Sequence, residues 1–300
     1  MSMHPTRRTL GLLTFGMLSG ATAFAKQTAP RNVGANAKTA DTELAALEAR
    51  GGGRLGVFAV DTGTGATISH RADERFPMCS THKVLVGGAI LSLIEAGKLR
   101  LDQMIPYGSN DLLEYAPVTK KNLSAGAMSV QGLCEAAIRW SDNTADNLLL
   151  KLIDGPAGWT RYARSIGDTA SRLDRFEPEL NTSLAGDPRD TSTPAAMTRT
   201  LATLLFGTVL NDASRAHLKG WMIDSEITAK LLPAGVPSGW HVADKSGSGA
   251  NGSRNDIGIL FPARGAPIVM SVFYTGSAAP QAERETIIAR CATIATRTFR

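Results

Sequence analysis

Apolar residues follow two different periods along this 300-residue chain. Near both ends, short runs of apolar and β-branched residues bounded by glycine-rich turns predict strands. These strands cover residues 54–61, 66–71, 242–248, 255–261 and 268–274. Elsewhere, apolar positions three and four residues apart predict helices. These helices cover residues 42–50, 77–97, 130–138, 145–152, 195–205, 218–223 and 283–298.

The order of these elements predicts an α+β fold with two domains. Strands at both ends and helices in the middle imply that the ends share one sheet, into which a helical domain is inserted. We expect an antiparallel sheet flanked by helices from residues 41–76 and 227–300. An all-helical domain would cover residues 77–226, with the active site between the two.

One long polar stretch in the middle of the chain, residues 168–194, has little periodicity. In a compact domain such a stretch is more often a functional loop than a passive connection. We therefore expect an active-site loop over residues 172–190.

The N-terminus has the pattern of a targeting segment. Arg7 and Arg8 precede the apolar run 10–18, and Ala23-Phe24-Ala25 is a small-x-small cleavage signal. We expect a signal peptide over residues 1–25 and export to the periplasm. The arginine pair fits both the twin-arginine and the general secretory route, and both stay open. Residues 26–40 contain no acidic or aromatic residue, which predicts a flexible tether.

Charge, cysteine and histidine usage exclude several classes of function. Without the two leader arginines, basic residues exceed acidic ones by only three, and they are scattered, so nucleic acid is not an expected partner. The three cysteines and five histidines match no disulfide framework or metal-ligand spacing, and we expect neither metal nor cofactor. After the leader no apolar run approaches a membrane span, so we expect no stable membrane association. A monomer is our default expectation for the oligomeric state.

Three short stretches together predict one catalytic site: Ser80-Thr81-His82-Lys83, Ser141-Asp142-Asn143 and Lys245-Ser246-Gly247. Ser80 and Lys83 are three residues apart, which puts hydroxyl and amine on one helical face. Because Ser80 falls in the first turn of a predicted helix, unpaired N–H groups and the helix dipole would favour developing negative charge there.

Together with Arg175-Phe176-Glu177-Pro178-Glu179-Leu180-Asn181, these stretches resemble the motifs of class A serine β-lactamases in the same order. The resemblance extends over nearly all of the mature chain. It implies a hydrolase that opens the β-lactam ring of penicillins, an expectation we extend to cephalosporins, and that confers β-lactam resistance. The range of substrates, including carbapenems, stays open.

The resemblance implies a catalytic role for each motif. Ser80 would attack the lactam carbonyl and form an acyl-enzyme. Either Lys83, or Glu177 acting through a water, would be the acylation base, and both stay open. Ser141 would relay a proton to the lactam nitrogen, its alternative role being a helix N-cap. Glu177 and Asn181, four residues apart, would hold the water that cleaves the ester.

The same resemblance implies a set of substrate contacts. Lys245, Ser246 and Arg254 would bind the substrate carboxylate, and the backbone N–H groups of Ser80 and Ser248 would form the oxyanion hole. Gly247 would let the backbone approach the ligand closely. The remaining contacts would come from the Asn143 amide, from Asn181 and from Tyr115 as an apolar wall.

Two departures from the family pattern change the picture. Cys79 precedes the nucleophile, but Gly249 stands where some relatives have a bridging cysteine, so we predict no intramolecular disulfide. His82 takes a place where we expect phenylalanine or another uncharged residue. It is either a packed neutral histidine or a charge that perturbs Lys83.

Two other functions compete with hydrolysis of β-lactams. A β-lactam-binding sensor would acylate at Ser80 and stay trapped, and a D-alanyl-D-alanine peptidase would act on peptidoglycan. Glu177 with Asn181 discriminates, because neither alternative needs a loop that activates water at the ester.

Overall fold

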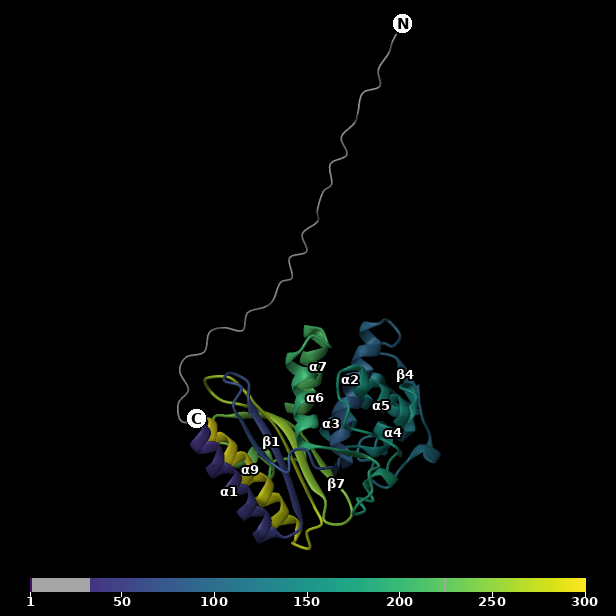
Figure 1. Ribbon diagram of the computed structural model, residues 1–300. Helices are drawn as coiled ribbons and strands as arrows, with labels where there is room; N and C mark the ends of the chain where they lie inside the picture. Colours follow the sequence, from purple (N-terminus) through teal and green to yellow (C-terminus); the bar gives the residue numbers. More distant parts are fainter. Residues whose placement is uncertain (2–32, 224) are drawn as a thin grey trace. The chain divides into compact units, whose positions relative to one another are not determined.

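The structure is a computed structural model that describes Met1 and residues 33–223 and 225–300 (Figure 1). The predicted signal peptide, residues 1–25, lies outside the described residues apart from Met1. No helix in the described ranges combines the length and apolarity needed to cross a membrane.

A five-stranded antiparallel sheet is the largest sheet of the described residues, with strand order β2-β1-β9-β8-β7. Its strands are β1 (Arg54–Asp61), β2 (Thr67–His70), β7 (His241–Ser248), β8 (Arg254–Phe261) and β9 (Ile268–Thr275). Both chain ends contribute strands, and β1 pairs with β9 from Arg54↔Thr275 to Asp61↔Ile268. The predicted α+β fold with an antiparallel sheet is confirmed.

Strand β9 separates two hydrophobic cores. Met270 and Val272 point to one face of the sheet, where they join a core with residues of α1 (Val33–Gly51) and α9 (Gln281–Phe299). Val269 and Phe273 point to the other face and join the core of the central helices. Figure 1 shows α1 and α9 side by side against the sheet. The period-2 alternation of a strand therefore sorts its residues between two layers.

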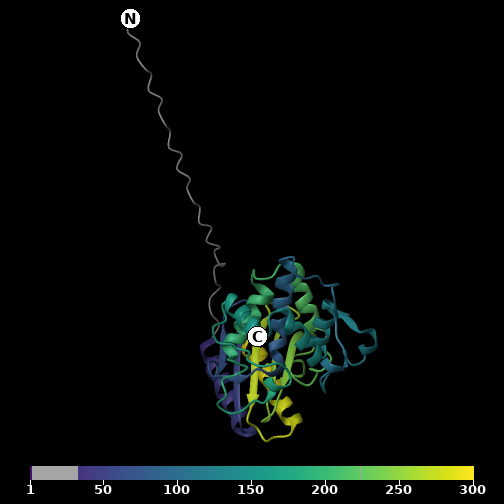
Figure 2. The same cartoon turned by 90° about the vertical axis from the view of Figure 1, so that its right-hand side faces the viewer.

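Helices from the middle of the chain cover the other face of the sheet (Figures 1 and 2). They are α2 (Lys83–Glu95), α3 (Val130–Arg139), α4 (Asn143–Leu152), α5 (Gly155–Ser165), α6 (Pro194–Phe206) and α7 (Asp212–Ile223), while the short α8 (Leu232–Gly235) contributes to the α1/α9 core. Two small sheets pair β3 (Phe76–Pro77) with β6 (Thr191–Ser192) and β4 (Met104–Pro106) with β5 (Ala127–Ser129). Helix α5 has no counterpart among the predicted helices, because its core-facing positions Trp159, Tyr162 and Ala163 stand among glycines and polar residues.

The expectation of a tether over residues 26–40 was wrong for residues 33–40, because α1 begins at Val33. Ala40 is 1% exposed and lies one turn before the buried Leu44. Packing against α9 thus extends the helix into a segment whose own sequence has a weak pattern. Residues 32–300 form one compact unit, and the division into a sheet domain and a helical domain stays a prediction.

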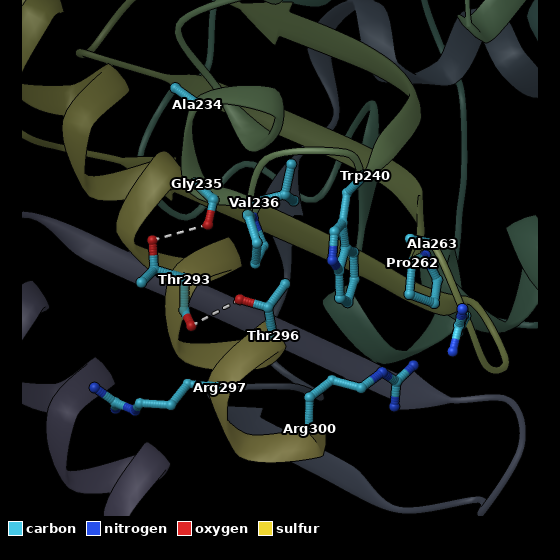
Figure 3. Close-up of a pocket in the computed structure, with 12 residues that line it drawn as sticks. Ala234, Gly235, Val236, Trp240, Pro262, Ala263, Thr293, Thr296, Arg297 and Arg300 are labelled. Atoms are coloured by element: carbon cyan, nitrogen blue, oxygen red, sulfur yellow. Dashed lines mark hydrogen bonds between the residues drawn. The ribbon is translucent and has the colours of Figure 1, made fainter.

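A surface pocket of about 810 Å³ lies between α8, the end of α9 and the β8–β9 turn. Trp240 is partly buried and lines this pocket with Val236 and Pro262 (Figure 3). The Arg300 guanidinium lies 5.7 Å from the centre of the Trp240 ring. None of the three motif stretches lines the pocket. Trp221, by contrast, belongs to the core of the central helices.

Candidate active site

Ser80 and Lys83 lie where a short 3-10 turn, Cys79–His82, leads into α2. Cys79 starts this turn in the left-handed region, with φ 47°. Both functional side chains are buried, Ser80 at 8% and Lys83 at 0% exposure. The predicted position of the pair at the start of a helix is therefore observed.

Three oxygen acceptors surround the Lys83 amine. Its Nζ lies 3.0 Å from Glu177 Oε1 and donates to the Ser141 carbonyl at 3.0 Å and to Asn143 Oδ1 at 2.6 Å. A protonated lysine has three N–H donors and no acceptor, so this arrangement matches an ammonium group. The ion pair with Glu177 is fully buried on both sides.

Glu177 reaches the nucleophile directly. The Ser80 hydroxyl donates to Glu177 Oε1 at 3.3 Å, and the Asn181 amide donates to Oε2. Asn181 Oδ1 is buried and has no hydrogen-bond partner among the described residues. One carboxylate thus contacts the serine, the lysine and the asparagine, and an amide acceptor beside it is available to a water. The Glu177–Pro178 peptide is cis.

Two sets of contacts hold the loop that carries Glu177. The Asn147 side chain accepts from the Glu177 N–H at 3.0 Å and donates to its carbonyl at 2.9 Å. Arg175 Nε pairs with the buried Asp190 carboxylate at 2.6 Å. Asp190 also accepts from the backbone N–H groups of Asp174 and Arg175. Asn147 was missed from the sequence, although it lies one turn after Asn143 on the same face of α4.

The break before α4 puts Ser141 into the site. Ser141 has φ 59°, and its Oγ accepts from Lys245 Nζ at 3.0 Å. The N-cap of α4 is Asp142, which accepts from the Ala145 N–H at 2.9 Å and also from Thr119. The alternative role of Ser141 as N-cap is therefore excluded, because its neighbour does this work.

Lys245 is a second buried ammonium in the site, but it lacks a carboxylate partner. Its Nζ donates to Ser141 Oγ and to the Ser246 carbonyl at 2.7 Å, and no acid of the described chain lies within ion-pair distance. Burial, followed by the positive charge of Lys83, lowers the pKa of Lys245 to about 7. This lysine therefore changes charge near neutral pH.

A buried pair of acids lies behind Lys245 on β7 and β8. Burial raises the pKa of Asp244 to about 6, and burial together with the Asp244 charge raises that of Asp256 well above its usual value. Asp244 accepts from Thr228 Oγ1 at 3.0 Å. Because the charge of Asp244 disfavours ionisation of Asp256, the negative charge near Lys245 is smaller than that of two carboxylates.

Arg254 stands directly opposite Ser248 in the β7–β8 register. It donates to Ser248 Oγ at 2.7 Å and to Glu285 at 3.1 Å. A Cβ on Gly247 would come within 2.8 Å of the Met78 carbonyl, so only glycine lets β7 lie this close to the turn that carries Ser80.

Tyr115 lies at the rim of the site with its side chain exposed. Its hydroxyl donates to the Trp140 carbonyl at 3.2 Å, and its own carbonyl accepts from the Asn143 N–H at 3.1 Å. The structure thus brings the predicted wall next to the predicted amide donor.

The three cysteines, Cys79, Cys134 and Cys291, are free and buried, which confirms the prediction of no intramolecular disulfide. Burial raises the pKa of the Cys79 thiol to about 12. A Cβ on Gly249 would lie 2.7 Å from Cys79 Sγ, so the missing side chain makes room for this thiol.

One group of side chains near the nucleophile has the composition of a metal site. Ligand atoms of His82, Asp146 and Glu177 all lie within 4.8 Å of one another and are buried. The Lys83 ammonium already lies 3.0 Å from the Glu177 carboxylate, and a second cation there would be repelled at short range. The geometry therefore favours a proton-holding cluster over a metal site.

Comparison with known proteins agrees with this arrangement. Residues 39–299 match the model of the beta-lactamase enzyme family. Beta-lactamase AST-1 of Nocardia asteroides is 50% identical over 79% of this chain and 76% of its own, and beta-lactamase L2 of Stenotrophomonas maltophilia is 45% identical over 95% and 93%. The solved class A β-lactamase of the last common ancestor of Gram-negative bacteria superposes with a TM-score of 0.86 at 50% identity, covering 87% of this chain and 100% of that one. The chain belongs to the class A β-lactamases.

Proposed function

We propose that this enzyme hydrolyses the amide bond of penicillins and cephalosporins through an ester on Ser80. The observation that carries the proposal is the position of Glu177 Oε1, 3.3 Å from the Ser80 hydroxyl and 3.0 Å from Lys83 Nζ. A serine needs an adjacent base to act as a nucleophile, and here a carboxylate contacts it. The named relatives are β-lactamases, which supports the substrate class.

In the acylation step, Glu177 takes the Ser80 proton while the serine oxygen attacks the lactam carbonyl. Lys83 holds the carboxylate in place, since all three of its N–H groups have acceptors. The N–H groups of Ser80 and Ser248 bind the oxyanion. Ser141, hydrogen-bonded to Lys245, donates a proton to the lactam nitrogen as the C–N bond breaks, and receives one from Lys245.

In the deacylation step, Glu177 and Asn181 activate a water that attacks the ester carbonyl. Before this step Glu177 gives up the Ser80 proton to solvent and Lys245 regains a proton from solvent, so that Glu177 is again a carboxylate. The carboxylate then takes a proton from the hydrolytic water, which the free Asn181 Oδ1 orients. The ester C–O bond breaks, and Ser80 recovers its proton. This step separates a catalyst from a trapped β-lactam binder.

Substrate binding uses the opposite wall of the site. Lys245, Ser246 and Arg254 bind the carboxylate, and Gly247 lets the β7 backbone lie close to it. Asn143 presents its amide to the acylamino side chain, and Tyr115 covers the rim.

The test is turnover of nitrocefin by Glu177→Ala, followed by intact mass. We expect acylation to slow but a covalent adduct on Ser80 to accumulate, because Lys83, the other candidate base for acylation, remains while the group that activates the hydrolytic water is gone. Glu179→Ala is the matched control: this exposed acid of the same loop should leave turnover unchanged. Undiminished turnover by Glu177→Ala would refute the role of Glu177. A single stoichiometric burst from the unmodified enzyme would identify a trapped binder instead.

We also propose that the chain is exported to the periplasm, loses residues 1–25 and acts there as a monomer that confers β-lactam resistance. Intact mass of the periplasmic protein tests cleavage after Ala25. Replacing Arg7 and Arg8 with lysines should abolish export by the twin-arginine route and leave general secretion intact.

A further inference from the structure

The peptide that joins Cys79 to Ser80 carries one of the proposed oxyanion donors. A peptide unit is planar, so the Cys79 carbonyl and the Ser80 N–H point in fixed opposite directions. Cys79 has φ 47°, a backbone conformation that residues other than glycine adopt only when neighbouring contacts hold them. Whatever holds the Cys79 carbonyl therefore also sets the direction of the Ser80 N–H.

His82 holds this carbonyl. Its Nδ1 lies 2.8 Å from the Cys79 oxygen, and because a carbonyl can only accept, Nδ1 carries the hydrogen. Its Nε2 lies 2.9 Å from Asp146 Oδ2, and one proton must lie between these two atoms. The ring is thus clamped between the peptide and a carboxylate 64 residues away.

The surroundings favour the imidazolium form of His82. Burial alone would lower its pKa, but the Asp146 carboxylate, helped by Glu177, outweighs burial and the opposing charge of Lys83, so the pKa is raised. These are the charged groups that face the ring. Trp159 covers it and donates to the His82 carbonyl at 3.1 Å.

Stability does not account for this pair. His82 and Asp146 are both 0% exposed, and Asp146 Oδ1 has no partner among the described residues. A buried carboxylate with an unsatisfied oxygen costs free energy, and apolar side chains of similar volume are often as stable or more so. A function for the charge explains its presence better.

We propose that His82 and Asp146 are positioning residues for the oxyanion hole. The imidazolium holds the Cys79 carbonyl and polarises the peptide, which makes the Ser80 N–H a stronger donor to the developing oxyanion, since hydrogen bonds in a chain strengthen one another. The inference rests on the proposed role of Ser80 and adds two residues to it. Neither residue touches the substrate.

The test measures the carbonyl stretch of the acyl-enzyme by infrared difference spectroscopy, with a carbonyl-labelled β-lactam and the Glu177→Ala background. Asp146→Asn keeps the shape and the bond to the Cys79 carbonyl but makes the ring neutral. His82→Phe with Asp146→Ala removes the bond and leaves no unpaired charge. In both we expect the stretch at higher wavenumber, and acylation slower by roughly tenfold, less than the 10²–10³ typical of deleting an oxyanion donor.

A remote pair of the same kind is the matched control. His70 Nε2 lies 2.6 Å from Glu48 Oε2, away from the site, so Glu48→Gln should lower the melting temperature without moving the stretch or the acylation rate. An unshifted stretch and an unchanged acylation rate in either folded variant would overturn the inference alone. Absence of an adduct on Ser80 in the Glu177→Ala background would overturn the proposed function, and the inference with it.

Discussion

Two regions of the site bury a lysine completely, and the two lysines have different partners. Lys83 and Lys245 are both 0% exposed. Lys83 lies 3.0 Å from the Glu177 carboxylate, whereas the contacts of Lys245 are a hydroxyl and a carbonyl. The pKa of Lys245 falls to about 7, with burial as the largest cause. Burial alone therefore does not define the state of an ionisable group; the charges beside it do.

The difference matches the work that each region does. Around Lys83 a fixed charge keeps the carboxylate next to Ser80. Around Lys245 an incoming substrate carboxylate would supply the missing negative charge. We therefore expect a site built this way to bind anionic ligands, because the charge of Lys245 has no carboxylate partner among the described residues.

The largest effect should come from Lys83→Met. This change leaves Glu177 buried without a cation, which costs about 3–5 kcal/mol of unfolding free energy for a broken buried pair. Acylation should fall by about 10²–10⁴. Urea unfolding and stopped-flow acylation measure the two effects. Unchanged stability would show that Lys83 does not compensate Glu177.

Lys245→Met should separate activity from stability. It removes an ammonium that pairs with no carboxylate of the described residues, so the unfolding free energy at pH 6 should rise by a few kcal/mol, at about 1.4 kcal/mol per unit of pKa shift. Meanwhile kcat/KM for a carboxylate-bearing β-lactam should fall by about 10². Lys230→Met, at an exposed lysine, is the control for both measurements. A less stable Lys245→Met would contradict the comparison.

The pH profile should report Lys245 in the free enzyme. Its pKa of about 7 lies below that of an ordinary lysine, so the ammonium is present below pH 7 and is lost above it. We expect kcat/KM for carboxylate-bearing β-lactams to fall above about pH 7, by up to tenfold per pH unit. The value of kcat should change less with pH, because the carboxylate of the bound substrate raises the pKa of Lys245.

Lys245→Arg provides the control for this profile, since arginine stays charged throughout. The alkaline fall should disappear in this variant. An unchanged fall would assign the titration to another group.

Asp190→Asn should weaken the loop that brings Glu177 to Lys83. It removes the charge that Arg175 and two backbone N–H groups contact, which costs about 1.5–3 kcal/mol. We expect slower deacylation and an adduct that persists longer in intact mass. If the deacylation rate is unchanged in Asp190→Asn, the ion pair of Asp190 with Arg175 does not position Glu177.

The smallest effect concerns Cys79, where burial acts with the opposite sign. Burial disfavours the charged form of both groups, so it lowers the pKa of a lysine and raises that of a thiol, here to about 12. The native protein should not react with a thiol reagent at pH 8, and reductant should leave activity unchanged. After denaturation without reductant, all three cysteines should react. Fewer than three would reveal a disulfide.

Periodicity and motif order were enough to predict much of this molecule. Strands at both ends and helices between them predicted the sheet, and β1, β8 and β9 lie within a residue or two of their expected bounds. The residues of the motif stretches meet in one site: Ser80 contacts Glu177, Lys83 contacts Glu177 and Ser141, and Ser141 contacts Lys245. Local patterns report which face of an element is apolar, and that information is contained in neighbouring residues.

Tertiary structure alone decided how those residues are charged and held. Helix α1 begins at Val33, ahead of its expected start, and packs against α9. The pairing of His82 with Asp146 and the two hydrogen bonds of Asn147 to Glu177 join residues far apart in the chain. The charges that act on Lys245 likewise come from Lys83, on another element, and from Asp256, on the neighbouring strand. Desolvation and charge pairing depend on distance in space, so a chain determines these properties but its local pattern does not display them.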